Sequence, residues 1–194
     1  VNCEYFHVDV VLSPDPNVFH HTNALAGLKE GGVFIIQSDQ GSPDKVWAEI
    51  PERYQQIIVD QKIRLYYLDA FNIAREEATD PDLQLRMQGI AFQGAFFAAS
   101  PLAEQAGLSE QKLHEAIRSQ LEHKFGSKGA RVVADNVRVV KRGYDEVREI
   151  TAQEVGIQTA SVIDMKAEPP LPVMVKRLPQ GKAPKSDIHR FWEQ

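Results

Sequence analysis

The chain contains a single cysteine, Cys3, among its 194 residues. One cysteine cannot form a disulfide within the chain, and it cannot supply the thiolates that hold an iron–sulfur cluster. No base or orienting group stands near Cys3 in the sequence that would activate it as a nucleophile. Internal disulfides and cysteine-ligated metal clusters are therefore excluded for this chain.

The chain also lacks a basic charge excess and long apolar runs. Its net charge of −5 gives no electrostatic attraction to nucleic acid or to an acidic membrane surface. No apolar run approaches the roughly 20 residues that span a bilayer, and the first four residues are neither basic nor apolar, unlike a signal peptide. We therefore predict a cytoplasmic protein with no nucleic-acid partner and no membrane partner.

The glycine-rich signatures of nucleotide binding are missing as well. The loop 13–17, which follows the first apolar run, has no glycine, and its two prolines lack the N–H groups that would bind a diphosphate. The chain has no G-x-S-x-G elbow and no H-E-x-x-H motif. The adjacent His20 and His21 would point about 100° apart on a helix, so they cannot share one metal ion. We predict no catalytic residue and no metal ligand in this chain.

What the sequence does contain is a strand–helix–strand pattern from Val8 to Asp39. Strands are predicted over 8–13 and 33–38, because Val8, Val10, Val11 and Leu12 and the segment 33–36 form apolar runs rather than a strict alternation, which is typical of strands buried on both faces of a parallel sheet. Parallel pairing needs a crossover, and we predict a helix over 17–28 for it, stopped by Gly31-Gly32. The pattern predicts an α/β fold with three layers, α/β/α, around a parallel-rich sheet.

The rest of the domain is predicted to add one more strand, over 64–69, and mostly helices. Helices are predicted between Pro43 and Pro51 and over 52–61, 70–78, 85–100, 109–125 and 129–148, with a turn at 79–82. The stretch 85–100 is apolar or small on nearly every side and contains Gly89 and Gly94. Because glycine disfavours a helix interior, these two glycines indicate close packing against another backbone.

Composition changes at about Glu149. We predict an α/β domain over 1–148 and a proline-rich extension or connector over 149–194, which cannot form a core of its own. Large apolar residues near its end, Phe191 and Trp192, indicate that it packs on a partner. The first strand begins within ten residues and no methionine starts the chain, so we expect an N-terminally truncated domain.

Each predicted strand ends beside acidic or hydroxyl residues. Ligands of open parallel sheets bind at the carboxyl ends of the strands. Aspartate and serine are also the usual turn and cap residues at such ends, and turn statistics favour that structural role. The candidate ligand-binding residues are Ser13, Asp15, Ser38, Asp39 and Asp69.

The ordered motifs over about 8–147 resemble those of one family. The segment 25–33, LAGLKEGGV, followed by Ser38-Asp39, is similar to the turn and second strand of the gamma subunit, or gamma domain, of the 2-oxoacid (pyruvate):ferredoxin/flavodoxin oxidoreductases. Further similar motifs follow in the same order: Tyr67–Ala70, Gly94-Ala95, Gly107–Ser109, Asn136-Val137 and Arg142–Tyr144. Members of this family have a glycine-rich strand and loop before the strand that begins here, and the extension 149–194 exceeds the usual gamma domain.

The resemblance implies a reaction that a whole complex performs. A 2-oxoacid such as pyruvate is oxidatively decarboxylated on thiamine diphosphate, electrons leave through iron–sulfur clusters towards ferredoxin or flavodoxin, and the acyl group passes to coenzyme A. This chain would be mainly architectural, would hold none of these cofactors and would be inactive alone. Its partners would be the other subunits or domains, and self-association stays open.

Two alternatives remain from the sequence. One is an unrelated small-molecule or nucleotide-binding α/β module that uses the loops after Leu12, Gln37 and Leu68. The other is a purely structural assembly domain.

Overall fold

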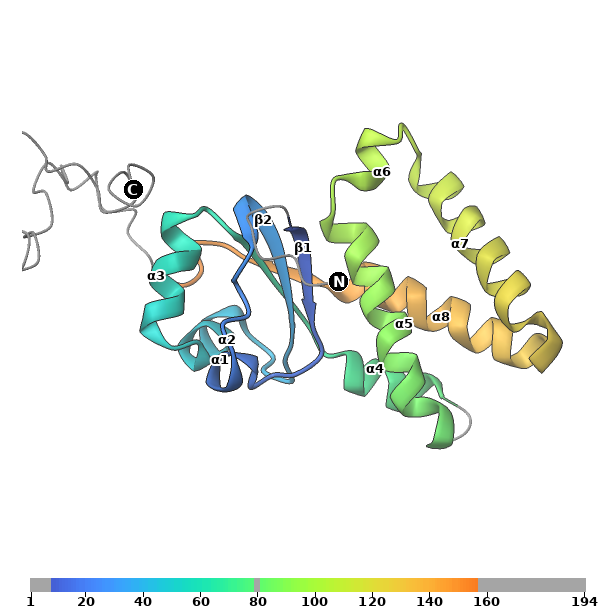
Figure 1. Ribbon diagram of the computed structural model, residues 1–194. Helices are drawn as coiled ribbons and strands as arrows, with labels where there is room; N and C mark the ends of the chain where they lie inside the picture. Colours follow the sequence, from blue (N-terminus) through green and yellow to red (C-terminus); the bar gives the residue numbers. More distant parts are fainter. Residues whose placement is uncertain (1–7, 79–80, 157–194) are drawn as a thin grey trace, which may run out of the picture. The chain divides into compact units, whose positions relative to one another are not determined.

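Four strands form one mixed sheet in the computed structural model, which describes residues 8–78 and 81–156 (Figure 1). Their order in the sheet follows the chain, with β1, β2 and β3 parallel and β4 antiparallel to β3. The strands are β1 Val8–Ser13, β2 Leu28–Gln37, β3 Arg64–Leu68 and β4 Arg148–Ile150. The predictions for Cys3 and for 157–194 lie outside the described residues.

The helices agree with the predicted ones over most of the chain. They are α1 Val18–His21, α2 Pro43–Glu49, α3 Glu52–Asp60, α4 Ala70–Glu77, α5 Pro81–Ala99, α6 Leu102–Gln105, α7 Glu110–Phe125 and α8 Ala130–Glu146, with a 3₁₀ turn η1 at Gly126–Lys128. The turn predicted at 79–82 is wrong in its second half, because Pro81 opens α5. Proline is tolerated there since the first turn of a helix has no use for its missing N–H.

The sheet is covered on both faces, which confirms the three-layer α/β/α fold. Phe34 and Ile36 of β2 face one core, which they share with Phe19, Val46 and other residues of α1–α3. The alternate residues of β2 face a second core, formed with α4, α5 and α8. Figure 1 shows α1, α2 and α3 on one side of the sheet and α4, α5 and α8 on the other. A continuous apolar run is therefore what β2 needs, since both of its faces are buried.

The crossover between β1 and β2 differs from the prediction. The helix expected over 17–28 is wrong: α1 has four residues, and β2 begins at Leu28. Gly31 does not stop a helix but lies inside β2 with φ +72°, and its N–H donates to the Gln61 carbonyl at 2.8 Å. Between the pairs Val8–Leu28 and Val10–Val33 the register shifts, so β2 bulges there. Glycine permits this bulge because its backbone adopts positive φ without strain.

The second half of the chain is helical, and α5 and α8 cross in close contact. A side chain on Gly94 of α5 would overlap the backbone of α8, and one on Gly143 of α8 would overlap that of α5. The packing prediction is thus confirmed for Gly94, whereas it is wrong for Gly89, which has open space around it. Helix α7 lies along α8 and buries Leu113, Ile117 and other residues spaced four apart, as its amphipathic pattern predicts (Figure 1).

Strand β4 extends the sheet where the sequence predicts no strand. Ile150 is 8% exposed and belongs to the core on the α1–α3 face, and Val155 packs against the same core. On the opposite side of the strand, Glu149 accepts a hydrogen bond from Arg64 Nε at 3.1 Å. The division of the chain at 148/149 and the connector role of the remainder stay predictions.

Candidate functional site: a cleft at the strand ends

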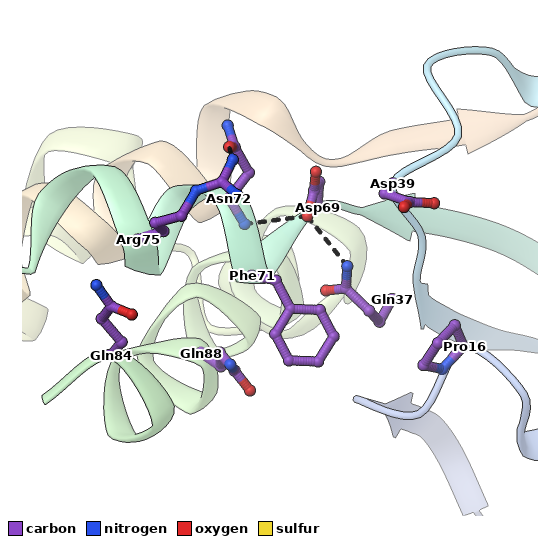
Figure 2. A pocket seen from close by; sticks show the side chains of 9 residues that line it. All are labelled: Pro16, Gln37, Asp39, Asp69, Phe71, Asn72, Arg75, Gln84 and Gln88. Atoms are coloured by element: carbon purple, nitrogen blue, oxygen red, sulfur yellow. Dashed lines mark hydrogen bonds between the residues drawn. The ribbon is translucent and has the colours of Figure 1, made fainter. Parts of the chain in front are cut away.

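A cleft of about 500 Å³ opens where β2 and β3 end, between their carboxyl ends and the helices α4 and α5 (Figure 2). This is the edge at which ligands of parallel sheets bind. The lining residues come from four segments of the chain: Pro16, Gln37, Asp39, Asp69, Phe71, Asn72, Arg75, Gln84 and Gln88. The topology therefore brings residues from the first loop to α5 into one concave surface.

Two of the five residues predicted from the strand ends, Asp39 and Asp69, line this cleft. Asp39 is exposed and its Oδ1 accepts a hydrogen bond from Gln40 Nε2 at 3.3 Å. Asp69 is half-buried and caps α4, since its Oδ1 accepts a hydrogen bond from Asn72 N at 3.0 Å. The structure thus places these two carboxylates beside a cavity, and their ligand-binding role stays a prediction.

The other three, Ser13, Asp15 and Ser38, are not among the residues that line the cleft. Ser13 Oγ donates to the carbonyl of Asp15 at 3.0 Å, and the Asp15 carboxylate accepts a bond from Asn17 N at 2.9 Å. Ser38 Oγ accepts a bond from Gln40 N at 3.2 Å. These are local turn contacts of the kind that aspartate and serine form at loop starts.

Gln37 is the residue that fixes the geometry of the cleft, and the sequence analysis does not single it out. Its side chain is 2% exposed, donates from Nε2 to Asp69 Oδ1 at 3.1 Å and accepts at Oε1 from Ala70 N at 2.9 Å. One buried amide thereby ties the end of β2 to the start of α4. The sequence feature that could have indicated Gln37 is its position directly after the buried run Val33–Ile36, because an amide buried there needs hydrogen-bonding partners.

The bonds to Asp69 leave part of its carboxylate unused. Oδ1 accepts both of the hydrogen bonds from Gln37 and Asn72, and no donor among the described residues bonds to Oδ2. A carboxylate can accept about four hydrogen bonds. Asp69 is therefore held in a fixed orientation and still has acceptor capacity for a donor from outside the chain.

The opposite wall supplies donors and an aromatic face. Arg75 of α4 donates to Asn72 Oδ1, and it forms no ion pair within the described residues. Gln84 and Gln88 lie one turn apart on α5, so their amides share one face of that helix. Phe71 is 42% exposed, and Figure 2 shows its ring between Gln88 and Pro16. The cleft can thus bind a polar group by several hydrogen bonds beside a flat apolar surface.

The polar side chains that line the cleft are carboxylates, amides and one guanidinium group. Its lining contains no serine, cysteine, histidine or lysine side chain. Within the part of the chain that the structure describes, no group of three or more His, Cys, Asp or Glu residues could hold a metal ion. The carboxylates and amides can bind and orient a polar group.

The groups with shifted pKa values lie outside the cleft. Hydrogen bonds from Arg142 lower the pKa of Glu76, and the bond to Glu146 raises that of Arg142. Burial raises the pKa of Tyr66 to about 12, helped by its hydrogen bond to Glu149. These groups connect α4 to α8 and β3 to β4. The shifted pKa values of Glu76, Arg142 and Tyr66 therefore reflect ion pairs and a buried phenol that join structural elements.

One histidine of the helical half, His114, is half-buried against Tyr144, with the ring centroids 5.0 Å apart. Its Nε2 lies 3.6 Å from Glu110 Oε1. The side chain is a packing residue between α7 and α8.

No helix within the described residues is both long enough and apolar enough to cross a membrane. This agrees with the absence of long apolar runs in the sequence.

Comparison with known proteins points to one family. The family model described as pyruvate ferredoxin/flavodoxin oxidoreductase matches residues 1–146. A putative pyruvate-flavodoxin oxidoreductase of Synechocystis is 25% identical over 149 residues, which cover 77% of this chain and 12% of the relative. The mitochondrial NADP⁺ pyruvate dehydrogenase of Euglena gracilis is 30% identical over 116 residues, 60% of this chain and 6% of that protein. The chain thus spans only a small part of these relatives.

A solved structure also resembles the chain. Pyruvate oxidoreductase subunit PORC of Thermotoga maritima is 22% identical, with a TM-score of 0.48 over 74% of this chain and 65% of that one.

The match over 1–146 takes in β1 to β3, every helix of the described part and the whole cleft. This match agrees with the family resemblance predicted from the ordered motifs between the first strand and Tyr144. The chain belongs to the pyruvate ferredoxin/flavodoxin oxidoreductase family.

Proposed function

We propose that this chain is the gamma-type part of a 2-oxoacid:ferredoxin oxidoreductase, mainly architectural and without activity of its own. The observation that carries the proposal is the family match over 1–146, which takes in β1 to β3 and all the described helices of the three-layer unit. The small share of each relative that the chain covers, 12% or less in the relatives described above, supports a role as one part among several. The whole assembly would convert a 2-oxoacid such as pyruvate to its acyl-coenzyme A.

The cofactors of that reaction are proposed to lie in other parts. An iron–sulfur cluster takes about four cysteine ligands, and this chain has one cysteine. A diphosphate needs backbone donors, and the loop 13–17 has two prolines and no glycine. The residues present therefore do not suit a cluster or a diphosphate at this loop. Thiamine diphosphate, clusters and coenzyme A would be bound elsewhere, with ferredoxin or flavodoxin as the electron acceptor.

The strand-end cleft is proposed as one wall of a site that a neighbouring part completes. Asp69 has an unused carboxylate oxygen, and Arg75, Gln84 and Gln88 offer donors beside the exposed ring of Phe71. Such a surface suits the binding of a polar group. Ligand binding by Asp39 and Asp69 belongs to this proposal. Ligand binding by Ser13, Asp15 and Ser38, which do not line the cleft, is proposed separately at the neighbouring strand ends. We also propose that the assembly is cytoplasmic.

Co-purification tests the proposal directly. The tagged full chain, produced together with the thiamine-binding and cluster-binding parts of its own assembly, is expected to elute with them in a fixed ratio. Asp69→Asn and Arg75→Gln test whether the cleft contributes to this co-elution. Asparagine at position 69 still caps the helix and still accepts the hydrogen bond from Gln37, so the fold is kept. Asp145→Asn, outside the cleft, is the matched control. Elution of the wild-type chain as a separate species would contradict the proposal.

A further inference from the structure

A second cavity, of about 260 Å³, lies in the helical half, between α5, the end of α7, the turn η1 and the start of α8. Its lining residues are Leu83, Arg86, Met87, Ile90, Lys124, Phe125, Lys128, Val132 and Asn136. It shares none of them with the strand-end cleft. The two cavities use different residues of α5, so this one needs an explanation of its own.

The floor of the cavity is apolar. Met87 is 2% exposed and belongs to the core between the sheet and α5, and Ile90 packs against that core as well. Phe125 and Ile90 are half-buried beside the core that joins α7 to α8. An apolar group placed here would gain burial at about 25 cal/mol for each Å² removed from water.

The rim, by contrast, is positively charged. Arg86, Lys124 and Lys128 are all exposed. The Nζ atoms of Lys124 and Lys128 lie 5.3 and 5.9 Å from the centroid of the Phe125 ring, so both ammonium groups gather around one side chain. Lys124 belongs to α7 and Lys128 to η1, so it is the turn between these elements that brings the two ammonium groups together.

None of the residues that line the cavity is acidic. Lys124 and Lys128 form no ion pair with any side chain that the structure describes. Neighbouring arginines on the same helices behave differently: Arg118 pairs with Glu122 at 3.0 Å, and Arg138 with Glu77 at 2.8 Å. In a chain of net charge −5, a cavity lined by three cations and no acidic residue has a local positive field. The end of α7 and the start of α8 meet here, so their opposite dipoles offset each other and the side chains set the field.

We propose that this cavity binds an organic carboxylate with a short apolar body. The carboxylate would lie between Lys124, Lys128 and Arg86, and the apolar body would cover Met87 and Ile90. The cavity is smaller than the roughly 300–1,000 Å³ of sites for drug-sized ligands, so one ring or a short chain fills it. An inorganic anion would make no apolar contacts with the floor of the cavity. A neutral ligand would gain no attraction from the three cationic side chains. This site is independent of the proposed role in the oxidoreductase.

A nuclear magnetic resonance titration of the full-length, ¹⁵N-labelled chain tests the site, with 3-phenylpropanoate as the probe. Saturable shifts are expected for the amides of Lys124, Phe125, Lys128 and Val132. The neutral 3-phenylpropanamide and inorganic phosphate, titrated in the same way, are each expected to bind at least about tenfold more weakly. Absence of saturable shifts with 3-phenylpropanoate, or equal binding of the neutral amide, would overturn the carboxylate site. Phosphate binding as tightly as the probe would overturn the role of the apolar floor.

Two double variants distinguish an effect of the cavity's own cations on affinity from an effect of the protein's net charge. Lys124→Gln with Lys128→Gln removes two rim charges at exposed positions, so the fold is retained and affinity for 3-phenylpropanoate is expected to fall about tenfold. Lys112→Gln with Lys141→Gln removes two charges from α7 and α8 outside the cavity, and the affinity is expected to stay unchanged. Equal effects of the two pairs would show that only net charge matters and would overturn the proposal.

Discussion

A Cβ atom on Gly143 of α8 would lie 2.8 Å from the carbonyl carbon of Ala91 in α5 and closer still to its oxygen. The reverse relationship also holds, because a Cβ on Gly94 of α5 would lie 2.8 Å from the amide nitrogen of Tyr144. The two helices therefore cross backbone against backbone. This contact holds α5 and α8 together within the layer that covers one face of the sheet.

Gly94→Ala and Gly143→Ala are each expected to lower the free energy of unfolding by about 1–3 kcal/mol, because the added methyl group overpacks the crossing. Urea unfolding followed by circular dichroism measures the change. Gly89→Ala is the matched control, since open space surrounds Gly89 in the same helix. It is expected to be neutral or to stabilise by up to about 1 kcal/mol. A destabilisation by Gly89→Ala equal to that of Gly94→Ala would contradict the crossing geometry.

Gln37→Leu is expected to destabilise the chain by about 1–3 kcal/mol, because it leaves the buried N–H of Ala70 without its acceptor and Asp69 with only one of its two donors. Gln40→Leu removes a half-buried amide that, among the described residues, bonds only to the exposed Asp39, so its effect should stay within about 0.5 kcal/mol. Thermal or urea unfolding of both variants gives the comparison. If both substitutions have the same small effect, Gln37 does not hold the strand end in place.

Tyr66 is expected to deprotonate near pH 12 rather than at its usual value of 10, because burial disfavours the phenolate. A raised folded-state pKa means that its contribution to stability is complete below about pH 10 and is lost as pH rises through about 12. Ultraviolet absorbance of phenolate in the wild type minus that in Tyr66→Phe isolates this group among the five tyrosines. A midpoint near 10 for the difference would contradict the buried environment.

Glu76 is expected to titrate below its usual range, because Arg142 donates to it at 2.8 Å. A depressed pKa gives a contribution to stability that is present above the usual value and is lost as pH falls through the folded-state value. Carboxyl resonances of ¹³C-labelled glutamate measure the pKa, and Arg142→Gln should raise it. Arg118→Gln, which breaks a pair within α7, should leave it unchanged. A pKa of Glu76 that does not respond to Arg142→Gln would be inconsistent with this ion pair.

The sequence predicts the strands and long helices where one pattern dominates. Phe34 and Ile36 alternate with Val33 and Ile35 between two cores, so the continuous apolar run identifies a buried strand. The same reasoning fails between β1 and β2. Gly31 takes positive φ there for a bulge inside a strand, and its N–H bonds to Gln61, 30 residues further along the chain. A contact that is distant in sequence decided the role of the glycine, and no local pattern encodes it.

The candidate site shows the same division. Strand ends identify Asp39 and Asp69 from the topology of parallel sheets alone. Arg75, Gln84 and Gln88 could not be found in this way, because they reach the cleft from helices whose rotation depends on tertiary packing. Gln37 could not be predicted for another reason. Its role depends on two hydrogen bonds between the end of β2 and the start of α4, which form only in the folded chain.

The central claim is that this chain is a non-catalytic part of a 2-oxoacid oxidoreductase, and add-back of activity tests it most directly. Coenzyme A-dependent reduction of an electron acceptor by pyruvate is measured for the chain alone, for the remaining parts of its assembly, and for the two combined. We predict no turnover by the chain alone, weak or no turnover by the remaining parts, and recovery on combination. Turnover by the isolated chain, or full activity of the other parts without it, would contradict the account.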